Sequence, residues 1–256
     1  MDKQAVAQQF SKAAPQYDAA AHLQRNIADR LLALVKNKQL PAKAHIADLG
    51  TGTGYCLPAL HQRFNPERLY ALDFSDAMLE VARARQPGIE CVHADLETAP
   101  FAPQSLDLAV SSLAVQWLDK PEPFITNIAK ALKPGGVLAL ATLGPKTLWE
   151  LKLAWAQVDS HRHINDFHDA VDWIEAVWDS QLRLELWREE RVEVRYDSPL
   201  ELLRELKALG ANHVDRDRSP RSSHLRQMLR QYDGFKRSDG RYPATWDACY
   251  LIARKP

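Results

Sequence analysis

The chain has 256 residues, enough for one large α/β domain or for a domain that carries a large insertion. Lys and Arg number 33, as do Asp and Glu, so the formal net charge of zero implies no general attraction to nucleic acid or membrane. Three scattered cysteines (Cys56, Cys91 and Cys249) form no C-x-x-C pair, which disfavours a disulfide framework or zinc site and fits a reducing cytoplasm.

The N-terminal segment predicts helices rather than a signal peptide. Residues 1–12 are polar and lack the apolar core of a secretory leader. We expect a short helix over 5–10, followed by a longer one capped by Asp18. In the longer helix apolar residues recur at helical spacing: Leu23, Ile27, Leu31, Leu34 and Val35.

Apolar strands then alternate with amphipathic helices, a pattern typical of a parallel sheet covered by helices on both faces. The tetrapeptide Lys133-Pro134-Gly135-Gly136 stops one helix and starts a strand. The apolar run 137–143 is far too short to span a bilayer. The predicted strands lie near 45–49, 68–72, 89–93, 106–111 and 137–142, and the predicted helices near 55–64, 76–86 and 121–132.

The pattern changes after Leu143 and predicts a helical insertion that caps the site. A basic cluster over 216–243 sets eight positive charges against three negative ones. The expected helices cover 147–158, 169–179, 198–209 and 222–231, and the expected strands cover 183–196 and 246–254. The basic residues are Arg216, Arg218, Arg221, Arg226, Arg230, Lys236, Arg237 and Arg241.

A glycine-rich turn follows the first predicted strand. That strand ends at Asp48, and the glycines at 50, 52 and 54 would let backbone N–H groups approach a ligand where a Cβ would clash. A strand-to-helix turn without a ligand is the alternative. Asp73 favours a ligand, because it lies roughly 20 residues further on, where nucleotide-binding α/β folds place an acid on ribose hydroxyls.

The spacing of this turn argues against a dinucleotide. Dinucleotide sites usually read G-x-G-x-x-G, with a pyrophosphate at a helix N-terminus. Here the turn reads D-x-G-x-G-x-G, and Asp48 opens it. A carboxylate repels a phosphate but attracts an ammonium group. S-adenosylmethionine carries an ammonium and a ribose without a phosphate.

Over about 45–143 the motifs resemble, in order, those of the class I S-adenosylmethionine-dependent methyltransferases. The resemblance implies a doubly wound, mostly parallel, seven-stranded Rossmann-like sheet, with S-adenosyl-L-methionine as cofactor. It implies that the glycine turn wraps the methionine part, that Asp73 takes the ribose hydroxyls, and that Asp95 accepts from the adenine amine. Many members have cysteine where this chain has Thr51, and a backbone role survives that change. The implied cofactor-binding residues are Asp48, Gly50, Thr51, Gly52, Gly54, Asp73, Phe74, Asp95, Leu96 and Ser111.

A narrower likeness concerns the substrate. The segments 10–18, 113–117, 206–212 and 240–246 look like those of the malonyl-acyl-carrier-protein O-methyltransferases of biotin biosynthesis. The likeness covers nearly the whole chain and is weakest over 143–200. It implies methylation of the free carboxylate of malonyl-acyl-carrier protein, giving a methyl ester primer for pimeloyl synthesis. The carrier protein would then be the partner, and we expect a cytoplasmic monomer that acts on neither nucleic acid nor membrane.

The reaction needs little acid–base machinery. A carboxylate is already ionised at pH 7, so catalysis should come from alignment and from removal of water. A positive charge, ideally an arginine fork, should hold the malonyl carboxylate. Tyr17, Gln116 and Trp117 are the catalytic candidates, although Tyr17 could simply pack a helix end and Trp117 fits the core equally well. The candidates for substrate or partner binding are Lys207, Arg216, Arg218, Arg221 and Arg241.

Other interpretations stay open. The acceptor could be a free small carboxylic acid or a quinone precursor, or the chain could bind the cofactor without transferring a methyl group. Nucleic-acid methylation is less favoured, because basic residues with interleaved aromatics do not form an extended stripe. His161 and His163 resemble a metal pair, but we expect surface residues and no metal.

We divide the chain into four parts. N-terminal helices over 1–40 would cover the cofactor site, and 41–145 would form the cofactor-binding core. A helical cap with the sixth strand would occupy 146–243, and 244–256 would supply the final antiparallel strand.

Overall fold

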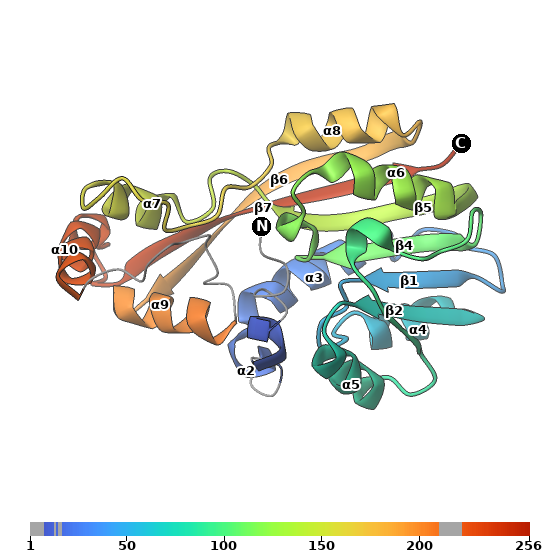
Figure 1. Cartoon of the computed structure of the whole chain (residues 1–256), viewed down its shortest axis with the longest axis horizontal. Helices are drawn as coiled ribbons and strands as arrows, with labels where there is room; N and C mark the ends of the chain where they lie inside the picture. Colours follow the sequence, from blue (N-terminus) through green and yellow to red (C-terminus); the bar gives the residue numbers. More distant parts are fainter. Residues whose placement is uncertain (1–7, 13, 15–16, 210–221) are drawn as a thin grey trace.

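The computed structural model describes residues 8–12, 14, 17–209 and 222–256, and its centre is one seven-stranded sheet (Figure 1). The strand order is β3-β2-β1-β4-β5-β7-β6. The first five of these strands run parallel, β7 is antiparallel to β5, and β6 is antiparallel to β7. The predicted mostly parallel, doubly wound sheet is therefore confirmed. The strands are β1 (His45–Leu49), β2 (Arg68–Asp73), β3 (Glu90–His93), β4 (Leu106–Ser112), β5 (Leu132–Leu143), β6 (Arg183–Tyr196) and β7 (Tyr242–Arg254).

Both faces of the central strands are buried, which explains why they read as nearly continuous apolar runs. Consecutive side chains of β1 enter different cores, with Ile46 on one face and Ala47 on the other. In β5, Val137 and Leu138 divide in the same way. The sheet thus separates two apolar cores that need helices on both sides.

The helices cover both faces of the sheet. One core is closed by α3 (His22–Val35), α4 (Leu57–Phe64) and α5 (Asp76–Arg85). The other is closed by α6 (Pro121–Ala131) and α8 (Ala170–Asp179). The position of α8 differs from the sequence prediction, because this helix lies in the expected cap yet packs on α6 beside the sheet. Within the described ranges, no helix is long and apolar enough to cross a bilayer.

Three helices gather at one end of the molecule, where β6 and β7 extend past the other strands (Figure 1). They are α7 (Trp149–Ala156), α9 (Pro199–Ala208) and α10 (Ser222–Tyr232). The last strand begins at Tyr242 rather than at 246, because Tyr242 already pairs with Tyr196 across the sheet. We call α7, α9 and α10 the cap helices. Within the long antiparallel pair, β7 contacts α7 and β6 contacts α9.

The helices differ in how their first turns are capped. Ser75 caps α5, since its side chain accepts a hydrogen bond from the Met78 N–H at 3.3 Å. The predicted cap at Asp18 is wrong. This residue lies inside the short helix α2 (Tyr17–Ala20), and α3 begins after Ala21 without a side-chain cap. The carboxylate of Asp18 is engaged elsewhere, as described below.

Candidate active site

Two pockets open where the parallel strands end, which is where open α/β sheets bind their ligands. The first follows the carboxyl ends of β1 and β2 and contains the glycine turn. The second lies between this site and the cap helices α7, α9 and α10. The two pockets share five lining residues: Phe10, Tyr17, Gln24, Leu113 and Trp117. Any ligands in the two pockets would therefore meet at these side chains.

The glycine turn has positive φ angles, which residues with a Cβ adopt only with steric strain. Gly50, Gly52 and Gly54 have φ angles of 70°, 54° and 78°. A Cβ on Gly50 would lie 2.2 Å from the Cβ of Ala114, so the turn could not pack there. A Cβ on Gly52 would meet nothing within 4 Å, and Gly52 lines the first pocket. The open space beside Gly52 is the part that a ligand can fill.

Three N–H groups of this turn donate hydrogen bonds to the end of β2. The N–H groups of Gly50 and Thr51 donate to the carbonyl of Leu72 at 2.8 and 2.9 Å. The N–H of Gly52 donates to Oδ2 of Asp73 at 2.8 Å. The turn is thereby fixed to the end of β2, which places Asp48 and Asp73 in one pocket.

Asp48 is a buried carboxyl on the wall of this pocket. Burial raises its pKa to about 7, and the nearby charge of Asp73 acts in the same direction. The Thr51 hydroxyl opposes this shift by donating to Oδ2 of Asp48 at 2.6 Å. A group poised between its two states would favour the ionised form once an ammonium group lay beside it.

Asp73 is half-buried at the end of β2 and faces the same pocket. Burial raises its pKa, while hydrogen bonds from the N–H groups of Ser75 (2.9 Å to Oδ1) and Gly52 lower it. Each carboxylate oxygen keeps acceptor capacity after these bonds. Two vicinal hydroxyls of a ribose fit such an acceptor pair.

Aromatic and aliphatic side chains continue the pocket on the far side of Asp73. Phe74 and Leu96 both line it. Asp95, also a lining residue, begins the short 3-10 helix η1 (Leu96–Thr98) by accepting a hydrogen bond from the Glu97 N–H at 3.0 Å. The arrangement offers apolar walls and one acceptor, as an adenine base requires.

The N-terminal segment covers the junction of the two pockets. The ring of Phe10 packs edge-on against Trp117, with centroids 5.6 Å apart, and lies 6.3 Å from the ring of Tyr17. Burial, followed by the charges of Asp73 and Asp18, raises the pKa of Tyr17. The phenol therefore stays protonated at neutral pH and can donate a hydrogen bond.

Asp18 fastens this cover to the core. Its Oδ1 accepts from the Thr53 hydroxyl at 2.8 Å, and its other oxygen pairs with Arg85 of α5. Arg85 also reaches the Thr53 hydroxyl, at 3.3 Å. We call Asp18, Thr53 and Arg85 the clasp, because they join α2 to the glycine turn and to α5.

The second pocket is mostly apolar. Gln116, in the 3-10 helix η2 (Val115–Trp117), donates its Nε2 to the Leu113 carbonyl at 2.7 Å. Lys207 of α9 is an exposed cation among the lining residues. The apolar lining includes Leu143, Leu148, Leu151, Trp155, Ile164, Phe167, Leu203, Leu206, Leu225 and Trp246. The pocket suits an elongated, largely apolar group better than a free ion.

Comparison with known proteins identifies the family. The model of a methyltransferase domain family matches residues 47–140. The chain is 36% identical to a malonyl-acyl-carrier-protein O-methyltransferase of Laribacter hongkongensis, over 100% of this chain and 90% of that protein. The chain belongs to the malonyl-acyl-carrier-protein O-methyltransferase family.

Two further similarities frame this assignment. The chain is 34% identical to the biotin biosynthesis bifunctional protein BioHC of Teredinibacter turnerae, over 99% of this chain but only 47% of that protein. It therefore spans about half the length of this bifunctional relative. An S-adenosylmethionine-dependent methyltransferase of Mesorhizobium loti shares the fold, with a TM-score of 0.55 and 19% identity over 89% of this chain and 96% of the other.

Two predicted cofactor residues of this methyltransferase lie outside the first pocket. Ser111 is fully buried, and its hydroxyl donates to the Leu49 carbonyl at 2.8 Å, so it joins β4 to β1 while the neighbouring Ser112 lines the pocket. A Cβ on Gly54 would lie 2.9 Å from Ala82, so Gly54 allows close packing of α5. The other eight predicted residues line the first pocket.

The three catalytic candidates also converge. Tyr17 and Trp117 line both pockets, and Gln116 lines the second. Trp117 is only half-buried, so its place is the pocket wall rather than the core.

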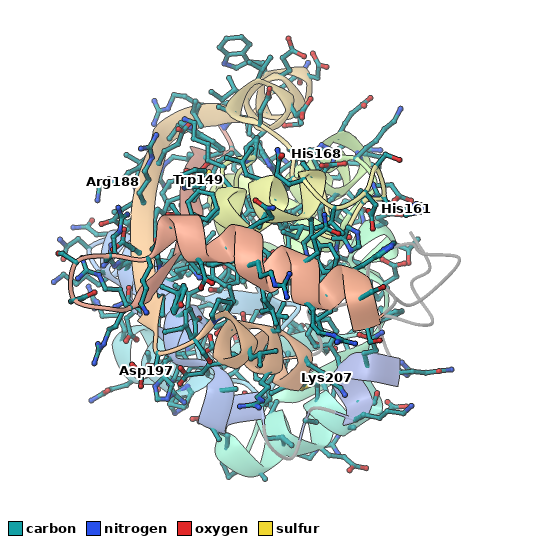
Figure 2. The ribbon with its side chains drawn as sticks, turned by 90° about the vertical axis from the view of Figure 1, so that its left-hand side faces the viewer. Trp149, His161, His168, Arg188, Asp197 and Lys207 are labelled. Carbon is teal, nitrogen blue, oxygen red and sulfur yellow. The ribbon has the colours of Figure 1, made fainter. Side chains whose placement is uncertain are left out.

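The basic candidates separate in space. Lys207 lines the second pocket, whereas Arg241 lines neither pocket and pairs with Asp197, its Nε 3.5 Å from Oδ1. Figure 2 shows Asp197 and Lys207 towards opposite ends of α9. Three further candidates lie outside the described residues: Arg216, Arg218 and Arg221.

His161 and His163 have different environments. His161 is exposed, as expected, and lies on the right-hand side of the view in Figure 2. The side chain of His163 is instead buried, stacked on Trp155 with ring centroids 3.6 Å apart. Its Nε2 lies 2.8 Å from Oδ1 of Asp159. Placing both histidines on the surface was therefore wrong for His163.

Sequence reasoning missed Gln24 and the clasp. Gln24 has no sequence signal beyond helical spacing, and only the packing of α3 brings it to the junction. Thr53 lies inside the glycine turn, so the sequence alone could have marked its hydroxyl as a group close to the site. Arg85 could not be paired with Asp18 from sequence, because 67 residues separate them.

Proposed function

We propose that this methyltransferase transfers a methyl group from S-adenosylmethionine to the free carboxylate of malonyl-acyl-carrier protein, giving the malonyl methyl ester. The observation that carries the proposal is the meeting of the two pockets at five shared residues. A donor in the first pocket and an acyl group in the second would come together there. Relatives that match nearly the whole chain carry this activity in their names.

The first pocket fits the donor. Asp48 would face its ammonium group, the space beside Gly52 would admit its amino-acid part, and Asp73 would accept from its ribose hydroxyls. The bound donor supplies a methyl group on a sulfonium, which is an electrophile that needs no metal. The fit rests on acids at both polar ends and on a space that an added Cβ would occupy.

The residues at the junction align and desolvate rather than exchange protons. The malonyl carboxylate is ionised at neutral pH and needs no general base. Phe10 and Trp117 would exclude water, and the protonated phenol of Tyr17 would orient the carboxylate. Gln116 would hold the loop after β4 through its bond to Leu113 and would line the acyl path.

The carrier protein would approach along the second pocket. Lys207 supplies a cation there, and Arg216, Arg218 and Arg221 are candidates for contacts with an acidic carrier surface. Arg241 would contribute only if its pair with Asp197 opened. We expect a monomer in the reducing cytoplasm, where the three unpaired thiols would persist, and we expect no nucleic-acid or membrane partner.

The product suits a biosynthetic role that the relatives' names also state. Esterification removes the charge of the distal carboxylate, so that end of the acyl group resembles the apolar end of an ordinary fatty-acid primer. We therefore propose that the methyl ester primes the pimeloyl chain for biotin synthesis.

The test uses purified protein, labelled donor and four acceptors: malonyl-carrier protein, malonyl-coenzyme A, free malonate and a quinone precursor. We expect a methyl ester on the carrier-bound malonyl group, detected by mass spectrometry of the intact carrier protein. Transfer only to free acids or to the quinone precursor would contradict the proposed substrate. Donor binding without transfer to any acceptor would indicate a binding module instead.

A further inference from the structure

The junction of the two pockets is electrically neutral. None of its five residues carries a formal charge: Phe10, Tyr17, Gln24, Leu113 and Trp117. Arg25 lines only the first pocket, and its guanidinium bonds to the Asp18 carbonyl at 2.5 Å and lies 3.0 Å from Nδ1 of His22. Lys207 lines only the second. Within the described part of the chain, the expected arginine fork is therefore missing from the junction.

Gln24 supplies an uncommitted amide at this place. It lies in the first turn of α3 and is half-buried. Its Oε1 is buried without a hydrogen-bond partner among the described residues. Gln24 lines both pockets, and a flip of its amide exchanges the oxygen and the nitrogen, so the nitrogen can face a ligand that accepts a hydrogen bond. The amide nitrogen is thus a neutral donor available at the point where acceptor and donor would meet.

Neutral donors suit this reaction better than a cation. A lone pair of the carboxylate oxygen forms the O–CH3 bond as the C–S bond breaks, and the bonding pair goes to sulfur. An anion and a sulfonium thereby become an ester and a thioether, and no proton moves. Because charge disappears along this path, a strong ion pair to the carboxylate would stabilise the reactants more than the transition state. Neutral hydrogen bonds orient the anion with less of this penalty.

We propose that Gln24 is a specificity-determining residue that donates its Nε2–H to the malonyl carboxylate at the junction of the two pockets. The inference rests on the proposed function and names the group that selects a carboxylate-bearing acyl chain. Tyr17 is the second neutral donor of the same junction. The carboxylate would face the positive charge of the sulfonium, and no arginine of the described residues lines the junction.

The first experiment measures binding, without turnover. Wild type and Gln24→Met are titrated with malonyl- and acetyl-carrier protein in the presence of S-adenosylhomocysteine. Wild type should bind the malonyl form more tightly, and Gln24→Met should lose about 10- to 100-fold of that preference, the value of a hydrogen bond to a charged group. Affinity for acetyl-carrier protein should stay within about threefold, since that ligand has no carboxylate to hold.

A matched substitution separates this role from a structural one. Gln62 lies exposed on α4 and lines neither pocket, so Gln62→Met should leave both affinities unchanged. Equal weakening of the malonyl and acetyl forms by Gln24→Met would overturn the proposal, because it would indicate disturbed packing. An unchanged preference would overturn it too.

The second experiment uses the pH profile. In Gln24→Glu the donor becomes a carboxylate that repels the substrate, so kcat/KM should fall at pH 8 by at least about tenfold relative to wild type. The loss should shrink as the pH falls and the introduced carboxyl becomes protonated and able to donate. A deficit that is independent of pH would contradict the donor role. Wild-type turnover of malonyl-carrier protein tests the proposed function separately.

Discussion

At the scale of single residues, the first pocket depends on Asp48, a carboxyl whose pKa the fold raises towards neutral pH. Burial raises the pKa of Asp48 to about 7, and the Thr51 hydroxyl restrains the shift. A carboxyl with a raised pKa favours folding at low pH and loses that contribution as the pH rises through its folded pKa. The contribution of Asp48 to the free energy of unfolding should therefore fall between about pH 4 and pH 7.

Replacing the Asp48 carboxyl by an amide should stabilise the ligand-free protein and weaken ligand binding. At pH 8, Asp48→Asn should raise the free energy of unfolding of the ligand-free protein by on the order of 2 kcal/mol, because it removes a buried charge. The gain should shrink as the pH falls below 7, where wild type becomes protonated. Urea unfolding at several pH values measures both effects. A gain that is the same at pH 5 and pH 8 would argue against ionisation of Asp48.

The same variant tests the ammonium contact. Wild type should bind S-adenosylhomocysteine more weakly as the pH drops below about 7, since Asp48 must then lose a proton before it can pair with the ammonium group. Asp48→Asn should bind weakly and lack this pH dependence. Calorimetry in buffers of different ionisation enthalpy would also report the proton released by wild type near pH 7.

At the scale of elements, the clasp joins the N-terminal cover to the cofactor-binding core. The Asp18 and Arg85 side chains remain 39% and 26% exposed, so solvent screens their attraction and the pair adds little to global stability. Its effect should be local. It holds α2, and with it Tyr17, over the glycine turn through Thr53.

Opening the clasp should therefore weaken binding more than folding. Arg85→Met should lower the affinity for S-adenosylhomocysteine about two- to fivefold and change the free energy of unfolding by less than about 1 kcal/mol. Arg83→Met is the matched control, because Arg83 lies exposed on the same helix and outside both pockets. Calorimetry and urea unfolding check the two quantities. Equal effects of both substitutions would mean that the clasp does not hold the cover.

At the scale of the whole molecule, the four-part division 1–40, 41–145, 146–243 and 244–256 remains a proposal. The connections argue for strong coupling between the parts. β6 of the cap segment pairs with β7 along its length, and β7 pairs with β5 of the core. The buried carboxylate of Glu150 in α7 accepts the Thr245 N–H of β7 at 3.1 Å.

We therefore expect core and cap to unfold in one cooperative transition. Trp173 of α8 is buried in the core that this helix shares with α6 and the sheet, whereas Trp155 and Trp246 line the second pocket, so tryptophan fluorescence reports on both regions. Fluorescence and far-ultraviolet circular dichroism should give the same urea midpoint. Two separated transitions would show that the cap is an independent unit.

The doubly wound, mostly parallel sheet and the place of the first pocket at its strand ends could be predicted from local sequence. Alternating apolar runs predict a parallel sheet, and the turn after β1 with Asp73 after β2 predicts a ligand at the strand ends, because these features depend on neighbours in sequence. The predicted start of β7 and the predicted cap of α3 were wrong, because pairing with β6 and the short helix α2 override local preference.

The sequence by itself determined the doubly wound sheet, the glycine turn and the two acids of the first pocket, since short-range sterics and hydrophobic periodicity specify them. Only the tertiary structure decided that Ser111 is internal, that Gln24 reaches the junction and that no arginine in the described residues lines both pockets. These contacts join residues far apart along the chain. Their geometry follows from how the helices pack on the finished sheet, which no local pattern encodes.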